Sequence, residues 1–252
     1  MPFTLSHAAA VLPLSRTPLP LAALMIGSMA PDFAYFVPDG PGLLSHSVPG
    51  LFRFCWPLGL LAWVIFVQVL EAPTLALLPD GWRASFARSD RSITLRNFAL
   101  ASVAVVAGAA THILWDGFTH ANTPVVDRLS FLETTSVGLF GKQFPLFRFL
   151  QHLSTVVGLV ALLAWAVHLK KSPAGAVDDS RRVRAATHGE RVLALLLVLG
   201  LSALLGFGGY FAHPELSLGR RLFHGAIGGM SGCALAWIAT AAIMQYRLRA
   251  RS

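Results

Sequence analysis

Five separate stretches of this chain are long and apolar enough to cross a membrane, and they constrain the fold more than any other feature. A helix that spans a bilayer needs about 20 mostly apolar residues. The five stretches are Leu51–Leu70, Phe98–Phe118, Phe149–Leu169, Val192–Phe211 and Leu222–Tyr246. The predicted fold class is therefore all-α, a polytopic membrane helical bundle with about five transmembrane helices.

The scarcity of charge supports this class and excludes others. Charged residues make up 13% of the chain, whereas soluble domains have about 25%. Hydrophobic residues make up 55%, which excludes an intrinsically disordered chain. The 20 Lys and Arg outnumber the 12 Asp and Glu, but they lie between the apolar stretches and form no stripe interleaved with aromatic residues. We therefore predict that the chain binds no nucleic acid and that its partner is the lipid bilayer in which it is embedded.

The N-terminal region contains one shorter apolar run, Leu19–Met29, which is followed by the pair Pro31-Asp32. Because prolines lie before this run and at its start, we predict a half-buried or re-entrant helical element, with a sixth span as the alternative. The first basic residue is Arg16. The N-terminus therefore lacks the positive region of a cleavable signal peptide, and we expect it to stay in the mature chain.

The basic residues are distributed unequally over the segments between the apolar stretches. Residues 71–97, residues 170–191 and the tail after Tyr246 are rich in Lys and Arg, whereas residues 119–146 and 212–221 are poorer. Segments rich in Lys and Arg stay in the cytoplasm. The N-terminal region and the two poorer segments are therefore predicted to face outward.

A polar stretch at residues 172–191, rich in Ser, Asp and Arg, is predicted to be a cytoplasmic linker. It divides the chain into two parts. Residues 1–171 are predicted to form a membrane domain that contains most of the chemically interesting groups. Residues 192–252 are predicted to form a C-terminal membrane part with two helices.

A histidine and aspartate motif at the end of the second apolar stretch is the most informative chemical signal. His112, Asp116 and His120 are spaced four residues apart, so they share one face of a helix. Imidazole and carboxylate form a ligand set that Zn²⁺, Mn²⁺ or Fe²⁺ accept. Ionisable groups in a membrane span are costly and usually mark function. We therefore predict a metal site, with a helix end whose polar side chains are solvated as the alternative.

Three further groups, His7, Asp32 and His46, lie in apolar surroundings before the first span. Taken singly, each is more readily explained as a polar residue in a loop, and an aspartate often starts a turn. The predicted topology, however, places all three on the outer face, where His112, Asp116 and His120 also lie. Because that topology rests on Lys and Arg alone, the agreement favours one site built from all six residues.

Four short motifs also resemble a known family. They are Phe3-Thr-Leu-Ser-His7, Gly27-Ser-Met-Ala-Pro-Asp32, His46-Ser47 and His112-x-x-x-Asp116. Together they look like a bacterial family of multi-pass membrane proteins of unknown function, which is similar to membrane-bound metal-dependent hydrolases. Their order and spacing also resemble the zinc-dependent phospholipase C and nuclease group.

This resemblance implies a site for one or two divalent ions, with zinc as the expected metal. The residues that would hold the first ion are Asp32, His46, His112 and Asp116. Asp116 would bridge to a second ion that His7 also binds.

The chain departs from the zinc phospholipases at a further ion, which those enzymes hold with two more histidines and the glutamate of a His-x-x-x-Glu helix. Here His120 and His152 could supply imidazoles, but Val156 stands where that glutamate would be. A third ion site is therefore in doubt.

A site of this kind suits the hydrolysis of a phosphoester. A bound divalent metal lowers the pKa of its water to about 7, and two metals about 3.5–4 Å apart can hold the attacking and leaving oxygens. We predict Asp32 as the general base. Arg53 and Arg148, near the outer ends of the first and third spans, are the candidate catalytic groups that clamp the phosphate. The alternative for both arginines is snorkelling to the membrane interface.

The predicted function is therefore an integral-membrane, phospholipase C-like metal-dependent hydrolase. We place it in the inner (cytoplasmic) membrane of a bacterium, with the site on the periplasmic face and a phospholipid or other amphiphilic phosphoester as the substrate. Two non-enzymatic alternatives stay open. A metal or proton transporter would need ionisable groups that continue to the inner face, and residues 98–108 offer none. A structural or assembly protein would use the polar groups only to join helices.

Overall fold

The computed structural model describes residues 4–36, 42–83, 85–86, 92–139, 141–171 and 183–249. Helices labelled η are 3₁₀ or π helices. The elements in chain order are η1 (Thr4–Arg16), α1 (Leu21–Met29), η2 (Ala30–Phe36), η3 (Gly42–His46), α2 (Val48–Gly50), η4 (Leu51–Cys55), α3 (Trp56–Ile65), η5 (Phe66–Leu70), α4 (Glu71–Leu77), α5 (Asp80–Arg83), α6 (Leu95–Thr119), α7 (Pro124–Arg128), α8 (Phe131–Thr134), β1 (Ser136–Leu139), β2 (Lys142–Pro145), α9 (Leu146–Lys171), α10 (His188–Phe211) and α11 (Leu218–Arg249). Residues 172–182 of the predicted linker lie outside the described residues.

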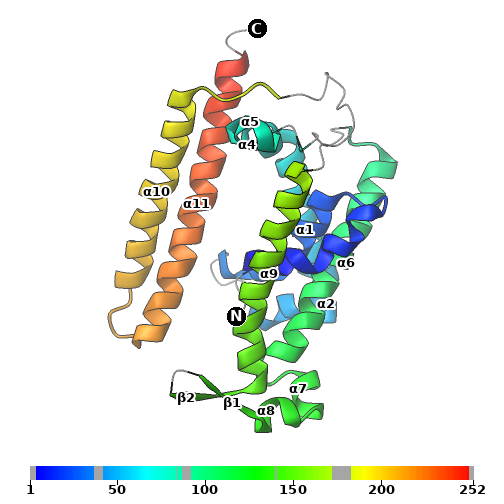
Figure 1. Cartoon of the computed structure of the whole chain (residues 1–252), viewed down its shortest axis with the longest axis vertical. Coiled ribbons are helices and arrows are strands. Elements are labelled where there is room, and N and C mark those ends of the chain that lie inside the picture. The colour runs from blue at the N-terminus through cyan, green and yellow to red at the C-terminus, as the bar shows by residue number, and fades with distance from the viewer. Residues whose placement is uncertain are drawn as a thin grey trace. The chain divides into compact units, whose positions relative to one another are not determined.

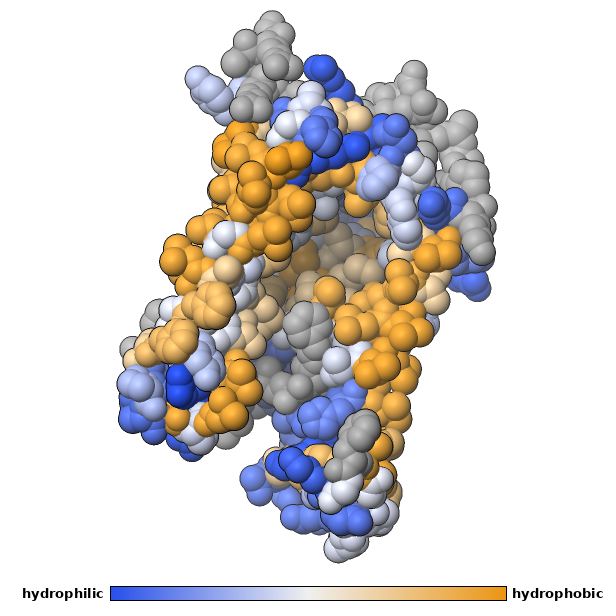
Figure 2. All heavy atoms as spheres, turned by 60° about the vertical axis from the view of Figure 1, so that its left-hand side comes forward, coloured by the Kyte–Doolittle hydropathy of each residue, from blue (hydrophilic) through white to orange (hydrophobic). Residues whose placement is uncertain are grey.

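The described residues contain five helices that are long and apolar enough to cross a membrane. They are Val48–Leu77, Leu95–Thr119, Leu146–Lys170, His188–Phe211 and Leu218–Tyr246. Figure 2 shows apolar residues along the lengths of the helices and hydrophilic residues gathered near their ends. Exposed large apolar side chains such as Val160 on α9 and Leu199 on α10 face the surroundings, as expected for a surface in lipid. The prediction of an all-α polytopic membrane bundle is therefore confirmed.

Two sequence predictions concern the length of individual apolar helices. The short apolar run forms α1 and continues through η2 as an apolar helix, Leu21–Phe36, that is shorter than a span. The sequence pattern predicts that the first span ends at Leu70. This prediction is wrong, because the helix runs on to Leu77 and the residue Glu71 is only 5% exposed. The charge of Glu71 does not end the helix, because the fold buries this side chain.

The chain forms two compact units, and the helix Val48–Leu77 contributes to both. The first unit comprises Met1–Trp63 and Ser92–His168, and the second comprises Val64–Arg91 and Leu169–Ser252. In the first unit, η1 and α1 lie across α6 (Figure 1).

Glycines allow the elements of the first unit to approach closely. A Cβ atom on Gly108 of α6 would lie 2.6 Å from the backbone nitrogen of Ser28, at the end of α1. A Cβ atom on Gly158 of α9 would lie 2.7 Å from the carbonyl oxygen of Ser6. These contacts hold η1 and α1 against the long helices α6 and α9. The polar residues of the N-terminal segments therefore lie close to those of α6.

The segment between α6 and α9 forms a small structure of its own in the first unit. Strands β1 and β2 pair antiparallel, with Ser136 opposite Pro145, and Gly141 has a positive φ of 73° in the turn between them. The helices α7 and α8 pack through Val126 and Leu132 against Phe147, the second residue of α9. This small core anchors the ends of the two long helices.

In the second unit, α10 and α11 form an antiparallel hairpin, and α4 and η5 pack against α11. The helix α10 begins with a capping box, in which Thr187 and Glu190 satisfy each other's backbone N–H groups. Two side chains of α11 reach the first span. Trp237 donates a hydrogen bond from Nε1 to Oγ1 of Thr74 (2.6 Å), and Gln245 donates from Nε2 to the carbonyl oxygen of Val69 (2.8 Å).

We expect Trp237→Phe to lower the free energy of unfolding by about 0.6–1.7 kcal/mol, the range found for hydrogen bonds between membrane helices. The change removes the Nε1 donor to Thr74 together with part of the indole ring, and the control variant below shares this loss of ring size. Denaturant titration in mixed micelles would measure the change. Trp56→Phe, at a side chain that is 39% exposed, is the matched control and should change stability little. If the two variants lower the free energy of unfolding equally, the hydrogen bond between Trp237 and Thr74 does not stabilise the fold.

Candidate metal centre

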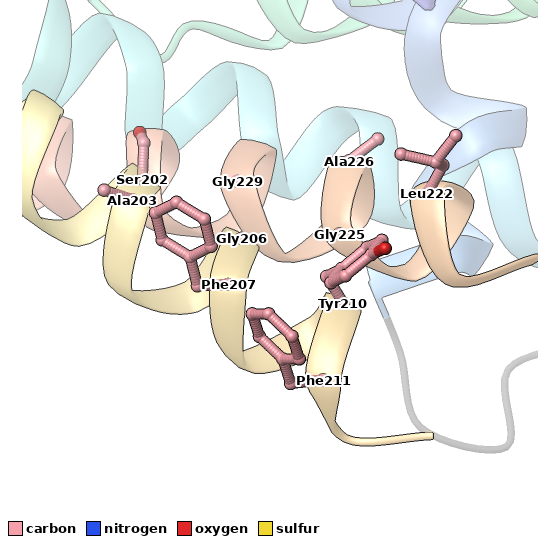
Figure 3. A pocket seen from close by; sticks show the side chains of 10 residues that line it. All are labelled: Ser202, Ala203, Gly206, Phe207, Tyr210, Phe211, Leu222, Gly225, Ala226 and Gly229. Carbon is pink, nitrogen blue, oxygen red and sulfur yellow. The ribbon is translucent and has the colours of Figure 1, made fainter. Parts of the chain in front are cut away.

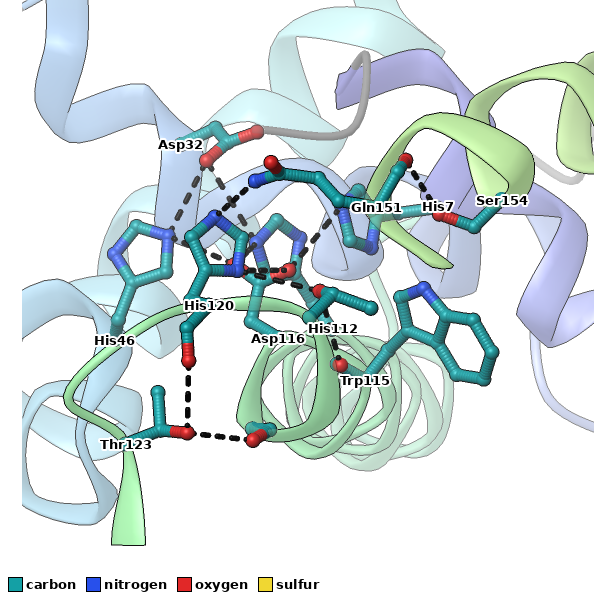
Figure 4. A network of polar contacts seen from close by, with 12 residues as sticks. His7, Asp32, His46, His112, Trp115, Asp116, His120, Thr123, Gln151 and Ser154 are labelled. Atoms are coloured by element: carbon teal, nitrogen blue, oxygen red, sulfur yellow. Dashed lines mark hydrogen bonds and ion pairs between the residues drawn. The ribbon is translucent and has the colours of Figure 1, made fainter. Parts of the chain in front are cut away.

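Six histidine and aspartate side chains from four segments of the first unit converge at the end of α6 (Figure 4). His7 comes from η1, Asp32 from η2 and His46 from η3. His112 and Asp116 lie on α6, and His120 caps its C-terminus. The structure thus brings together all six residues that the sequence singled out, although their role as metal ligands stays a prediction.

Four of these residues form a closed ring of alternating nitrogen and oxygen atoms. The Nε2 atom of His46 lies 3.2 Å from Oδ1 of Asp32 and 3.7 Å from Oδ2 of Asp116. The Nε2 atom of His112 lies 3.6 Å and 3.2 Å from the same two oxygens. Donor atoms about 2.0–2.1 Å from a tetrahedral zinc ion stand about 3.3–3.4 Å apart. The four separations therefore fit four of the six edges of such a tetrahedron.

The second oxygen of Asp116 faces a different pair of nitrogens. Its Oδ1 atom lies 3.7 Å from Nε2 of His7 and 3.5 Å from Nδ1 of His120. The ring of His7 also stacks on that of His112, with centroids 3.7 Å apart, and nitrogen and oxygen atoms of His7, Asp32 and His112 lie within 4.8 Å of one another. Asp116 is thus placed to bridge two adjacent groups of ligands.

Backbone and hydroxyl groups orient two of the imidazoles. Nδ1 of His112 lies 2.7 Å from the carbonyl oxygen of Ser28. A carbonyl only accepts, so Nδ1 carries the proton and the lone pair of Nε2 points into the ring of ligand atoms. Nδ1 of His46 lies 2.9 Å from Oγ of Ser45, a hydroxyl that donates to Nδ1 while Nε2–H donates to Asp32 and accepts from Nδ1–H when Nε2 binds a metal. Metal-binding histidines are commonly held in this way through the other ring nitrogen.

The charge states of the groups outside the long helices suit cation binding. Burial raises the pKa of Asp32, but the hydrogen bond with His46, the nearby His112 and the hydrogen bond from Thr4 outweigh it and keep the pKa below its usual value. Thr4 donates to Oδ2 of Asp32 at 2.6 Å, which leaves Oδ1 facing the imidazoles. Burial, followed by the proximity of His112, lowers the pKa of His7 to about 4. Near neutral pH, Asp32 is thus ionised and His7 is neutral, as metal ligands must be.

Within the described part of the chain, three buried polar atoms of the cluster lack a hydrogen-bond partner. Nε2 of His7, Nε2 of His112 and Oδ1 of Asp116 are buried, and none has a hydrogen-bond partner. The 3.2 Å contact between His112 and Asp116 does not have hydrogen-bond geometry. A buried polar atom without a partner costs about 1–3 kcal/mol. Divalent cations bound among these residues would satisfy the three atoms, so the residues present fit a metal.

Gln151 of α9 is a member of the site that the sequence did not reveal. Its side-chain nitrogen is placed 3.1 Å from Nε2 of His120, and the residue is 9% exposed. If His120 binds metal through Nδ1, its Nε2 carries the proton, and Gln151 must present its oxygen instead, with the amide rotated by half a turn. A glutamine near the start of an apolar helix gives no distinctive signal, so only its position in space identifies it.

If His120 and Asp116 hold an ion, we expect Gln151→Leu to weaken its binding by about 10–100-fold, the usual cost of losing a group that orients a metal ligand. Gln151→Glu keeps an oxygen acceptor for Nε2 and should retain most of the affinity. Titration of the chelator-treated protein with zinc would measure both. Equal loss in the two variants would contradict the orienting role.

The two arginines that were predicted to clamp phosphate lie outside this network. Arg53 lies in η4 and Arg148 in the first turn of α9, and both are exposed. Among the described residues, neither forms a hydrogen bond or ion pair with the six residues of the cluster. His152, the other candidate imidazole, is also exposed and contacts the ring of Phe144 instead, with centroids 6.4 Å apart.

The fold and the cluster together define a polytopic helical membrane protein with a buried histidine and aspartate centre. The chain belongs to the family described as "Domain of unknown function (DUF4184)", whose model matches residues 1–244. No curated protein and no solved structure gives a significant match to the chain. The family thus covers both units but assigns no activity to them.

Proposed function

We propose that this chain is an integral-membrane, metal-dependent hydrolase that acts on a phosphoester, with a phospholipid or another amphiphile as the substrate class. The observation that carries the proposal is that six side chains bring imidazole nitrogens and carboxylate oxygens within 3.7 Å of one another in successive pairs. Buried imidazoles and carboxylates with unsatisfied atoms are the composition of a divalent-cation site.

The geometry favours two ions held by shared residues. The ligands of the first ion would be Asp32, His46, His112 and Asp116. The second would be held by His7, His120 and the remaining oxygen of Asp116. Two imidazoles with two carboxylates suit zinc, while manganese and iron accept the same donors. When bound, such metals polarise a phosphoryl oxygen and lower the pKa of water to about 7.

The chain's own residues define how a substrate would approach. The side chains of His46 and His120 are 17% and 26% exposed, whereas that of His112 is fully buried. The open side of the cluster is therefore that of His46 and His120. Oδ2 of Asp32 accepts from Thr4, and Oδ1 faces the Nε2 atoms of His46 and His112, which favours a role in holding metal over the role of general base.

The surroundings of the cluster support an amphiphilic substrate at the membrane surface. The cluster lies at the C-terminal end of the span α6, and the exposed guanidinium groups of Arg53 and Arg148 are available to an anionic headgroup. The segment that follows α6 is poor in basic residues, which supports an outward-facing site. We propose the periplasmic face of a bacterial cytoplasmic membrane as its location.

A purely structural role agrees less well with the cluster. A polar network that only joins helices gains stability when every member has a partner, and an incompletely satisfied network is worse than an apolar contact. Here three buried atoms on His7, His112 and Asp116 have none. Such atoms are what a ligand would be expected to satisfy.

The test is a measurement of metal content and hydrolysis on the full chain in lipid nanodiscs. We expect zinc, manganese or iron to be retained, and release of phosphorylated headgroups from phosphatidylcholine or phosphatidylglycerol to stop on chelation and resume when metal is added back. A protein that retains no divalent metal would overturn the proposal. Retained metal together with metal uptake into vesicles and no hydrolysis would replace it with transport.

A further inference from the structure

The hairpin of α10 and α11 carries an apolar groove that is built from the second unit alone (Figure 3). Its volume is about 500 Å³. Phe207, Tyr210 and Phe211 of α10 line one side, and small residues such as Gly206 and Gly229 form much of the rest. No charged side chain lines the groove, so its interior suits hydrocarbon.

Helix packing explains only some of the glycines in this hairpin. A Cβ atom on Gly228 or Gly232 of α11 would collide with the backbone of α10, so close packing requires glycine at both positions. Gly206 and Gly229 differ, because the nearest atoms to a Cβ there would lie at 3.4 Å and 3.6 Å, which are ordinary contact distances. Their lack of a side chain is not needed for packing, but it keeps the groove open.

The end of the groove nearest the turn between the helices is positively charged. Arg220 and Arg221 lie in the first turn of α11. Arg221 donates a hydrogen bond from Nε to the carbonyl oxygen of Tyr210 (3.3 Å), and its guanidinium carbon lies 4.2 Å from the centre of the Tyr210 ring. None of the described residues accepts a hydrogen bond from the two terminal nitrogens of Arg221. The nearby acid, Glu215, pairs with His213 at 3.3 Å.

We propose that this groove binds one acyl chain of an anionic phospholipid, whose headgroup phosphate contacts Arg221. The turn joins two spans, so the first turn of α11 lies at the depth of the lipid phosphates. The guanidinium group, held against Tyr210, presents its free nitrogens in the fork that matches a phosphate. The lining residues Ser202 to Phe211 extend over about 14 Å of helix, so the acyl chain runs from the headgroup level towards the bilayer centre.

Charge favours a lipid over a second copy of the chain as the occupant of the groove. Two copies related by a twofold axis along the membrane normal would bring two sets of Arg220 and Arg221 to the same depth on facing surfaces. Like charges at that interface repel, whereas a lipid phosphate neutralises them. The site uses no residue of the metal centre and does not depend on hydrolysis.

The test is lipid retention, measured by native mass spectrometry on the full chain released from nanodiscs of equal phosphatidylglycerol and phosphatidylcholine. We expect preferential retention of one phosphatidylglycerol. Arg221→Gln should weaken it about tenfold, the cost of one charge-assisted hydrogen bond. Arg128→Gln, which removes an exposed arginine of the first unit, is the matched control and should leave retention unchanged.

A second variant separates lipid binding from folding. Gly206→Ala combined with Gly229→Ala adds two methyl groups to the groove, and a Cβ atom at either position alone lies at least 3.4 Å from its neighbours. Alanine also has a higher helix propensity than glycine. We expect equal or higher thermal stability together with loss of the retained lipid. Equal retention of the two lipids by the unaltered chain, or unchanged retention in the double variant, would overturn the proposal. If the unaltered chain is a dimer and the double variant is a monomer, the groove binds a second copy of the chain, and the lipid proposal is overturned.

Discussion

Asp116→Asn should abolish binding of both proposed metal ions and, with it, the proposed hydrolysis. Each oxygen of Asp116 faces a different pair of imidazoles, His46 with His112 on one side and His7 with His120 on the other. The substitution keeps the shape but removes the negative charge and one of the two acceptor oxygens. Elemental analysis of the purified variant should find metal reduced from one or two ions per chain to a trace. We expect hydrolysis to fall by at least about 100-fold, in line with the loss of a metal-activated water.

The matched control is Asp127→Asn, which changes an exposed aspartate of α7 in the same unit. It should leave metal content and hydrolysis unaltered. His112→Ala and its control His152→Ala provide a second pair, with a buried and an exposed imidazole. Full metal content in both Asp116→Asn and His112→Ala would contradict the proposed centre, because no other residue in the described cluster can replace both oxygens of Asp116.

Gly108→Ala should weaken metal binding from a position that touches no ligand atom. A Cβ atom there would collide with the carbonyl oxygen of Leu24 and lie 2.6 Å from the nitrogen of Ser28, so α1 must move away from α6. That movement withdraws the Ser28 carbonyl from Nδ1 of His112. We expect a loss of about 1–3 kcal/mol in the free energy of unfolding, as for overpacking in a core, and zinc affinity lower by about 10–100-fold.

Gly200→Ala is the control for this prediction, because a Cβ atom at that position of α10 meets nothing within 4 Å. It should leave zinc affinity unchanged and keep or raise stability. Denaturant unfolding and zinc titration of the two variants together separate the causes. If Gly108→Ala loses stability but binds zinc as tightly as the unaltered chain, the Ser28 carbonyl does not orient His112.

The spans could be predicted from sequence because burial in lipid requires long apolar runs, and each of the five runs became a helix. Their ends could not be predicted as well. The first span continues past Glu71 through α4, since the fold buries a carboxylate that a sequence pattern reads as a boundary. The π-helical turns η4 and η5 within that span could not be predicted either, because the local sequence shows no pattern that distinguishes a π helix from an α helix.

The six residues of the cluster could be predicted to share one end of the bundle, because their spacing and the distribution of basic residues agree. Their supporting groups could not. The contact to His112 comes from the backbone of Ser28, which every residue type possesses, and Gln151 is an ordinary polar residue in an amphipathic turn. The division of roles between the two oxygens of Asp116 likewise depends on distances that sequence does not contain.

The depth of the cluster along α6 has an electrical consequence. His112 lies seven residues before the helix ends at Thr119, which is about 10 Å, or roughly a third of a hydrocarbon core of about 30 Å. A divalent cation that enters from that end therefore crosses at most about a third of the transmembrane field, worth about 1.5 kcal/mol per 100 mV against about 4.6 kcal/mol for full passage. If the centre binds metal as proposed, its loading would be only weakly coupled to the membrane voltage, and the supply of metal on one side of the membrane would determine whether it is filled.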